Sequence, residues 1–162
     1  DAIGGVDVYS DQVFSEYGYY FNQGYNHLDG TRALYYSRIR HVFSEGDRKR
    51  GEHQKQIIEA IINKVTSSKT ILKNYDSFLN SMEGFFQTNI PSILIKKYVR
   101  NQLDTMDKWT IKSIAINGYD SSGETYSMPG WILYLVIPDQ NTIDYASHMI
   151  NGMIQGKSIN EL

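Results

Sequence analysis

The most regular alternation of apolar and polar positions in the chain lies between residues 47 and 65. At about 100° per residue, one helical face is polar in its first half and apolar in its second half, and it carries Asp47, Arg50, Gln54, Ile58, Ile61 and Val65. Gly46 interrupts the preceding segment, and Asp47 is suited to cap the free amides of a first turn. The pattern predicts a helix over residues 48–65 that buries its apolar half and leaves its polar half at the edge of the core.

Capping residues and helical spacing predict further helices at 12–16 after Ser10 and Asp11, at 31–36 after Asp29, at 71–86, at 90–105, and from Asp139 or Asn141 to about Ile154. Residues 66–69 are predicted to form a loop. Pro91 falls in the first turn of the helix at 90–105, where its missing N–H is harmless. The stripe on the last helix consists of Ile143, Ala146, Met149, Ile150 and Met153.

Alternating residues predict strands at 6–9 and 109–116, and residues 19–28 are typical of a strand or hairpin. The continuous apolar run at 131–137 is typical of a strand buried on both faces, and the polar residues 118–130 predict a long loop before it. Strands of this kind together with amphipathic helices predict an α/β fold. We expect a three-layer α-β-α arrangement in which helices cover both faces of a mixed central sheet.

Composition limits the possible functions. With 162 residues, 41% of them hydrophobic, the chain suits one domain with its own core. A net charge of −2 argues against a general nucleic-acid binder, so we predict no nucleic-acid partner. The absence of cysteine excludes disulfides, thiol chemistry and cysteine-containing zinc sites. The four histidines have no metal-binding spacing, and His41 and His53 are the two that border the basic residues discussed next.

The candidate chemistry is anion binding at the start of the helix at 48–65. A helix N-terminus offers unpaired N–H groups, and Arg38 and Arg40 approach it along the chain while Arg50 lies on its first turns. Guanidinium groups bind phosphate oxygens bidentately and keep their charge, so the cluster suits a phosphate or pyrophosphate. The alternative is that Asp47 and Arg50 form an ordinary surface pair three residues apart and that the other arginines are plain surface charges.

Several spaced motifs resemble the LytR-CpsA-Psr family. Residues 33–40, ALYYSRIR, followed by Asp47, Arg50 and Gln54, are similar to the family's ALxYxRxR…DxxRxxxQ signature. Residues 4–8, GGVDV, resemble its mid-domain strand, and residues 109–113, 128–134 and 138–139 resemble its closing strands and helix. The similarity spans almost the whole chain and is nearest to the capsule-linked streptococcal type.

The resemblance implies a membrane-anchored enzyme on the extracytoplasmic face of a Gram-positive bacterium. Such an enzyme transfers a glycopolymer from a polyprenyl pyrophosphate carrier to peptidoglycan with magnesium, and pyrophosphatase activity is a further possibility. By position, Arg38, Arg40, Arg50 and Gln54 would bind the pyrophosphate and the adjoining lipid. Asp47 would orient the arginines or take part in catalysis, which makes Asp47 and Arg50 the candidate catalytic residues.

This chain departs from the family pattern in two respects. Many members have an arginine where His53 stands, which reduces the basic cluster. The family's magnesium-binding aspartates and a further pyrophosphate-binding arginine precede the GGVDV segment, with which this chain begins. The resemblance therefore implies that residues 1–162 are the C-terminal portion of one catalytic domain. The metal ligands, the N-terminal strands and the transmembrane anchor would lie outside this portion.

Three functions are compatible with these observations. The first is the phosphotransferase, and the second is a module that binds a polyprenyl phosphate or a wall glycan without turnover. The third is a transcriptional regulator. We rank it last because the sequence contains no helix-turn-helix with a basic recognition helix.

Overall fold

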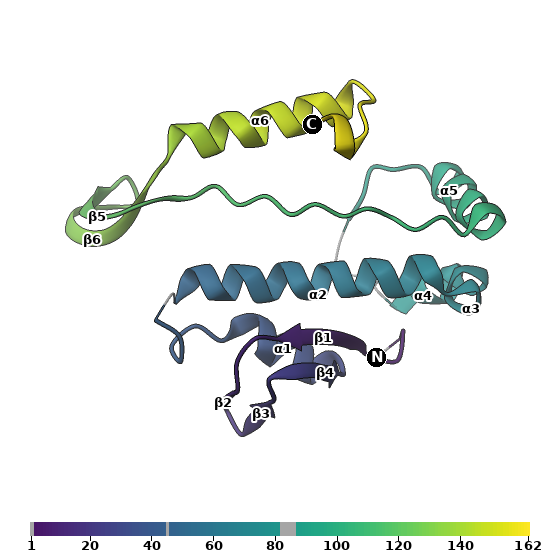
Figure 1. Cartoon of the computed structure of the whole chain (residues 1–162), viewed down its shortest axis with the longest axis horizontal. Helices are drawn as coiled ribbons and strands as arrows, with labels where there is room; N and C mark the ends of the chain where they lie inside the picture. Colours follow the sequence, from purple (N-terminus) through teal and green to yellow (C-terminus); the bar gives the residue numbers. More distant parts are fainter. Residues whose placement is uncertain (1, 45, 82–86) are drawn as a thin grey trace. The chain divides into compact units, whose positions relative to one another are not determined.

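The structure is a computed structural model that describes residues 2–44, 46–81 and 87–162. It divides the chain into two compact units, Asp1–Trp109 and Thr110–Leu162, which are considered separately (Figure 1). No helix among the described residues is both long enough and apolar enough to cross a membrane.

The strands of the first unit form two small antiparallel sheets. They are β1 (Val6–Ser10), β2 (Phe14–Glu16), β3 (Tyr19–Phe21) and β4 (Gly24–Leu28). β1 pairs with β4 in a register that places Val6 opposite Leu28, and β2 pairs with β3 as a hairpin. The prediction of a helix at 12–16 is wrong. The Ser10 hydroxyl donates to the Gln12 carbonyl at 2.7 Å in a turn, and Phe14 then enters the core from a strand.

The helices of this unit are α1 (Gly30–Arg38), α2 (Asp47–Ser67), α3 (Lys69–Lys73), α4 (Tyr75–Ser81) and α5 (Ser92–Thr105). Asp29 caps α1 as predicted, since its Oδ1 accepts from the Arg32 amide at 2.8 Å. Asp47 does not cap α2. The cap position is Gly46, which has a φ of 51° and no side chain, and the Asp47 carboxylate lies in the first turn.

The boundaries of the other helices differ from the predictions. α2 continues to Ser67, so the predicted loop at 66–69 shortens to a single residue before α3. The predicted helix at 71–86 is two short helices separated at Asn74, and residues 82–86 lie outside the described residues. Pro91 is the residue before α5 and not part of its first turn.

The buried face of α2 differs from the predicted one. Its buried residues are Lys49, His53 and Ile57, whereas Ile58 is 57% exposed. Figure 1 shows β1, β4 and α1 on one side of α2, and α2 contacts both α1 and β1. The predicted helix is present. Its buried face is shifted by one residue because the His53 imidazole and the aliphatic part of the Lys49 side chain are buried at the core.

The core of the first unit is rich in aromatic rings. Its buried members are Val6, Val8, Phe14, Phe21, Leu28, Tyr36, Ile39, Phe43 and Ile57. The Phe14 ring lies 4.9 Å from Phe21, 5.0 Å from Phe43, 5.4 Å from His53 and 5.6 Å from Tyr36, centroid to centroid. This cluster joins the β2–β3 hairpin, α1 and α2, which are the elements that carry the candidate site.

The second unit contains β5 (Gly118–Thr125), β6 (Met128–Pro138), α6 (Gln140–Ile154) and a short 3₁₀ turn at Ile159–Glu161. Asp139 caps α6 as predicted, accepting from the Asn141 amide at 3.0 Å. In the stripe of α6, Ala146 and Met149 are buried, but Ile150 and Met153 are more than half exposed. The predicted helix is therefore confirmed, but only part of its predicted apolar stripe is buried.

Three predictions for this unit are wrong. Residues 109–116 form no strand, and residues 118–130 are not a loop, because β5 pairs with β6 from Gly118 opposite Pro138 to Thr125 opposite Met128. β6 includes the predicted strand at 131–137, but Trp131 and Ile132 are 66% and 70% exposed, so it is not buried on both faces. The polar residues of β5 obtain backbone hydrogen bonds from an apolar partner strand, and their own composition does not indicate such a partner.

The α/β class is confirmed. Among the described residues, the first unit has two two-stranded antiparallel sheets, β1–β4 and β2–β3, and the second unit has one, β5–β6.

Candidate anion-binding site

A pocket of about 540 Å³ lies beside the C-terminal end of α1 and the first turns of α2. The described residues that line it are Glu16, Tyr17, Tyr35, Arg38, Arg40, His41, Arg50 and Gln54. All four residues predicted to bind the pyrophosphate therefore line one pocket. The arginines come from different elements, which the fold brings together.

A buried isoleucine positions the first two arginines. Ile39 is 2% exposed and extended, with φ −64° and ψ 129°, and it ends α1 by anchoring the chain in the aromatic core. Arg38 and Arg40 flank this anchor, and both line the pocket. Gln54 on α2 donates from Nε2 to the Ser37 carbonyl at 3.3 Å, which ties α2 to the end of α1. The backbone around Arg38 and Arg40 is thus held in place by the buried Ile39 and by the hydrogen bond from Gln54.

Asp47 holds the guanidinium groups rather than lining the pocket. Its Oδ1 lies 2.7 Å from Nη2 of Arg50 and 3.9 Å from Nη1 of Arg40. Asp47 is not among the described residues of the pocket wall, whereas both of its partners are. The pair of residues 47 and 50 on a first helical turn is therefore present, as the alternative interpretation of the sequence expected, but its arginine also faces a pocket.

Sequence patterns did not identify two residues of the pocket, Glu16 and Tyr17. Both lie at the tip of the β2–β3 hairpin, and Glu16 is the last residue of the segment that the sequence predicted as a helix. The signal that was available is Gly18 directly before the aromatic run at 19–21, since a glycine between two short segments that contain aromatic residues is compatible with a tight hairpin turn. Of the two tyrosines at the end of α1, Tyr36 is fully buried, while Tyr35 lines the pocket and stacks on Tyr19 at 4.4 Å between ring centroids.

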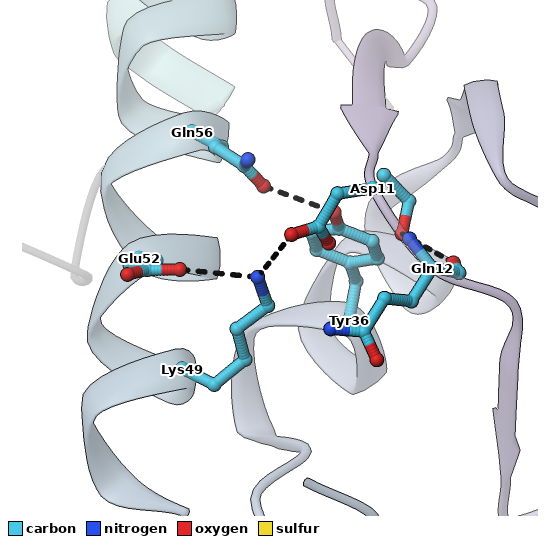
Figure 2. Close-up of polar contacts among 7 residues, drawn as sticks. Asp11, Gln12, Tyr36, Lys49, Glu52 and Gln56 are labelled. Carbon is cyan, nitrogen blue, oxygen red and sulfur yellow. Dashed lines mark hydrogen bonds and ion pairs between the residues drawn. The ribbon is translucent and has the colours of Figure 1, made fainter. Parts of the chain in front are cut away.

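An ion-pair cluster of Asp11, Lys49 and Glu52 joins α2 to the turn between β1 and β2 (Figure 2). The Lys49 ammonium lies 2.7 Å from Oδ2 of Asp11 and 3.2 Å from Oε2 of Glu52, and the Lys49 side chain is 10% exposed. Burial alone would lower the pKa of Lys49, but its two carboxylate partners outweigh burial and raise it. The hydrogen bond from Lys49 lowers the pKa of Asp11. The ion pair stays charged through the physiological range and holds the β1–β2 turn against α2.

His53 lies in the core and not in the basic cluster. It is 1% exposed, its ring packs against Phe14 and Tyr36, and neither ring nitrogen has a hydrogen-bond partner among the described residues. Burial lowers the pKa of His53, and the positive charge of Lys49 adds to this, while the Tyr36 backbone and nearby carboxylates oppose it. Burial of His53 therefore favours its neutral form in the folded protein, because its pKa is lowered.

We expect this histidine to make stability depend on pH. The pKa of His53 is below its ordinary value of about 6.5 in the folded protein, so the unfolded chain binds more protons below that pH. The free energy of unfolding should fall as pH drops from 7.5 to 5.5, by at most about 1.4 kcal/mol per unit below pH 6.5. Urea denaturation at several pH values measures this. His53→Phe should remove most of the slope, and an equal slope in both proteins would contradict the assignment.

Among residues 2–44, 46–81 and 87–162, no three histidine, aspartate or glutamate side chains lie together in a group that could hold a metal ion. The role of magnesium stays a prediction.

Two curated proteins, both named polyisoprenyl-teichoic acid–peptidoglycan teichoic acid transferase TagU, are similar to this chain. The protein from Enterococcus faecalis is 32% identical over 126 residues, which cover 78% of this chain and 41% of that protein. The protein from Oceanobacillus iheyensis is 31% identical over 155 residues, which cover 96% of this chain and 45% of that protein. This chain therefore spans less than half the length of these two relatives.

A solved structure is also similar to this chain. A crystal structure from Enterococcus faecalis, described as a transcriptional regulator, matches with a TM-score of 0.70 and 27% identity, covering 96% of this chain and 54% of that one. The profile of the LytR_cpsA_psr family matches residues 1–138. This match extends over both the pocket and the β5–β6 hairpin. The chain belongs to the LytR-CpsA-Psr family.

Proposed function

We propose that the pocket binds the pyrophosphate of a polyprenyl-linked glycopolymer, and that the full-length protein transfers the glycopolymer to peptidoglycan. The observation that carries this proposal is the convergence of Arg38, Arg40 and Arg50 with Gln54 on one pocket. The names of the TagU relatives support a teichoic-acid-like polymer, and the motif similarity to capsule-linked members supports a capsular polysaccharide. The location would be the extracytoplasmic face of a Gram-positive membrane, to which a transmembrane anchor would hold the protein.

The positive charge of the three arginines accounts for the proposed transfer reaction. Three guanidinium groups neutralise the pyrophosphate in the ground state, and they stabilise the charge that develops on the departing lipid phosphate when a sugar hydroxyl of the acceptor attacks. The same groups would support hydrolysis if water replaced the sugar hydroxyl. Because the described residues contain no group of three histidine, aspartate or glutamate side chains that could hold a metal ion, we derive no step through the metal.

A titration tests the proposal. In calorimetry, the full-length protein should bind geranyl pyrophosphate saturably and should not bind geraniol, and the affinity should fall with rising salt because guanidinium–phosphate pairs are screened. In a transfer assay, addition of peptidoglycan should release polyprenyl phosphate from the carrier-linked polymer. Equal binding of geraniol and geranyl pyrophosphate would contradict the pyrophosphate site. Binding without any release of lipid phosphate would favour the module that binds without turnover.

The role of Asp47 can be separated from proton transfer. Since its Oδ1 binds Arg50 at 2.7 Å and it is not part of the described pocket wall, we expect Asp47 to position Arg50. Asp47→Asn keeps an oxygen that can accept from Arg50, so turnover should fall by less than about tenfold. Loss of a general base would lower turnover by about 10²–10⁴-fold. A loss of that size in Asp47→Asn, with geranyl pyrophosphate affinity unchanged, would make Asp47 the base instead.

Transcriptional regulation has less support. The net charge is −2, and the three arginines of the cluster line a pocket. A specific gel shift with promoter DNA at physiological salt would favour this alternative.

A further inference from the structure

A carboxylate lines the pocket among the arginines. Glu16, the last residue of β2, is the one acidic residue among the described residues of the pocket wall. Its Oε2 is buried and has no hydrogen-bond partner in the described structure. A buried polar atom without a partner is destabilising, and folded proteins seldom keep one unless a ligand or water satisfies it. Glu16 therefore points to a part of the ligand that the arginines do not recognise.

The hairpin that holds Glu16 is itself strained. Tyr17 and Gly18 connect β2 to β3 with φ values of 51° and 80°, as a tight two-residue hairpin turn with two positive φ angles requires. Glycine adopts this conformation freely, but a tyrosine there is strained. The Tyr17 ring lines the pocket 5.7 Å from the Tyr35 ring, centroid to centroid. The sequence thus keeps an unfavourable residue at the position that extends an aromatic wall beside Glu16.

The chemistry of the missing partner is restricted. An ionised carboxylate only accepts hydrogen bonds, and phosphate oxygens also only accept, so Glu16 repels a pyrophosphate and requires a donor. The guanidinium groups of the pocket are donors, yet Glu16 forms no ion pair with them among the described residues. The partner should be an O–H group that enters together with the anion.

We propose that Glu16 accepts a hydrogen bond from a sugar hydroxyl bound next to the pyrophosphate, and that it thereby favours ligands that carry a sugar at that position. The inference rests on the proposed function. The hydroxyl belongs either to the first sugar of the carrier-linked polymer or to the acceptor glycan, and both present the same group to the carboxylate. Aromatic side chains such as Tyr17 and Tyr35 offer the apolar face on which a sugar ring packs.

Calorimetry on the full-length protein with three probes tests this inference. The probes are geranyl pyrophosphate, geranyl pyrophosphate carrying one hexose, and a peptidoglycan disaccharide added to protein already saturated with geranyl pyrophosphate. The variant is Glu16→Gln, which keeps the shape and removes the charge. The matched control is Glu59→Gln, because Glu59 is exposed on α2 and is not among the described residues of this pocket.

Glu16→Gln should weaken the binding of one hydroxyl-bearing probe about tenfold, since hydrogen bonds to charged groups are the stronger ones. Its affinity for geranyl pyrophosphate should stay equal or rise, because a repulsive charge is removed. Weaker binding of the hexose probe identifies the carrier sugar, and weaker binding of the disaccharide identifies the acceptor.

Unchanged affinity for both hydroxyl-bearing probes would overturn the inference and leave the pyrophosphate site intact. Equal weakening of all three probes would also overturn it, because that result indicates a structural role for Glu16. Failure of the wild-type protein to bind geranyl pyrophosphate would overturn the proposed function together with this inference.

Discussion

Arg50→Ala should lower the affinity for geranyl pyrophosphate about 100-fold while the protein keeps its fold. Arg50 lies on the first turns of α2, its side chain is 35% exposed, and its guanidinium is held by Asp47 at 2.7 Å. Because the pair already fixes the side chain, little conformational entropy remains to be lost when a phosphate binds. Charge-assisted hydrogen bonds contribute about 1.5–3 kcal/mol each, and 1.4 kcal/mol corresponds to tenfold in affinity.

The matched control is Arg100→Ala. Arg100 is exposed on α5 and does not belong to the described pocket wall, so this variant makes the same change of charge away from the site. Its affinity for geranyl pyrophosphate should stay within about twofold, because an exposed and distant charge is screened by salt. Circular dichroism and the melting temperature establish that both variants are folded. Equal losses in the two variants would mean that the protein attracts pyrophosphate through its general charge and not through the pocket.

Phe14→Ala should lower the free energy of unfolding of the first unit by about 3–5 kcal/mol. The Phe14 ring is 6% exposed and packs against the rings of Phe21, Tyr36, Phe43 and His53. Its removal leaves a cavity where the β2–β3 hairpin, α1 and α2 meet, and the loss is a large part of the 5–15 kcal/mol typical of a domain. Urea denaturation followed by circular dichroism measures the change.

The neighbouring residue provides the control for this experiment. Val13 is 54% exposed, so Val13→Ala should change the free energy of unfolding by less than about 0.5 kcal/mol. Phe14→Leu restores most of the lost volume and should recover part of the stability. A loss below about 1 kcal/mol in Phe14→Ala would mean that the hairpin does not pack on the core as the structure has it. Because the same hairpin carries Glu16 and Tyr17, Phe14→Ala should also weaken the binding of whichever hydroxyl-bearing probe Glu16→Gln weakens.

The position of His53 illustrates how a family pattern and a fold can differ. The similarity to the family aligned His53 with an arginine of the basic cluster, and we expected a weaker cluster at that point. In the structure, its imidazole is buried in the core and stacks on the Phe14 ring, with 5.4 Å between ring centroids. The pocket keeps three arginines without it. We therefore expect His53 to contribute to stability and to its pH dependence, and it is not among the described residues that line the pocket.

The sequence by itself determined the elements whose causes are local. α1 and α6 begin where Asp29 and Asp139 can accept from the first free amides, and a cap requires contacts over only two or three residues. The helix at 48–65 followed from its periodicity in the same way. The spaced signature from residue 33 to Gln54 also identified the family and named the arginines that line the pocket. The ligand of those arginines stays a prediction.

Tertiary structure alone decided what depends on distant partners. The predicted face of α2 was one residue away from the buried face, because α1, β1 and β2 together select which side of the helix has neighbours. Residues 118–125 form a strand because an apolar strand pairs with them, and strand propensity mostly measures such partners. Glu16 reaches the pocket because Phe14 anchors its hairpin in the core. Helix caps and helical periodicity depend on residues that are close together in the sequence. Burial and strand pairing depend on contacts between segments that are far apart in the sequence.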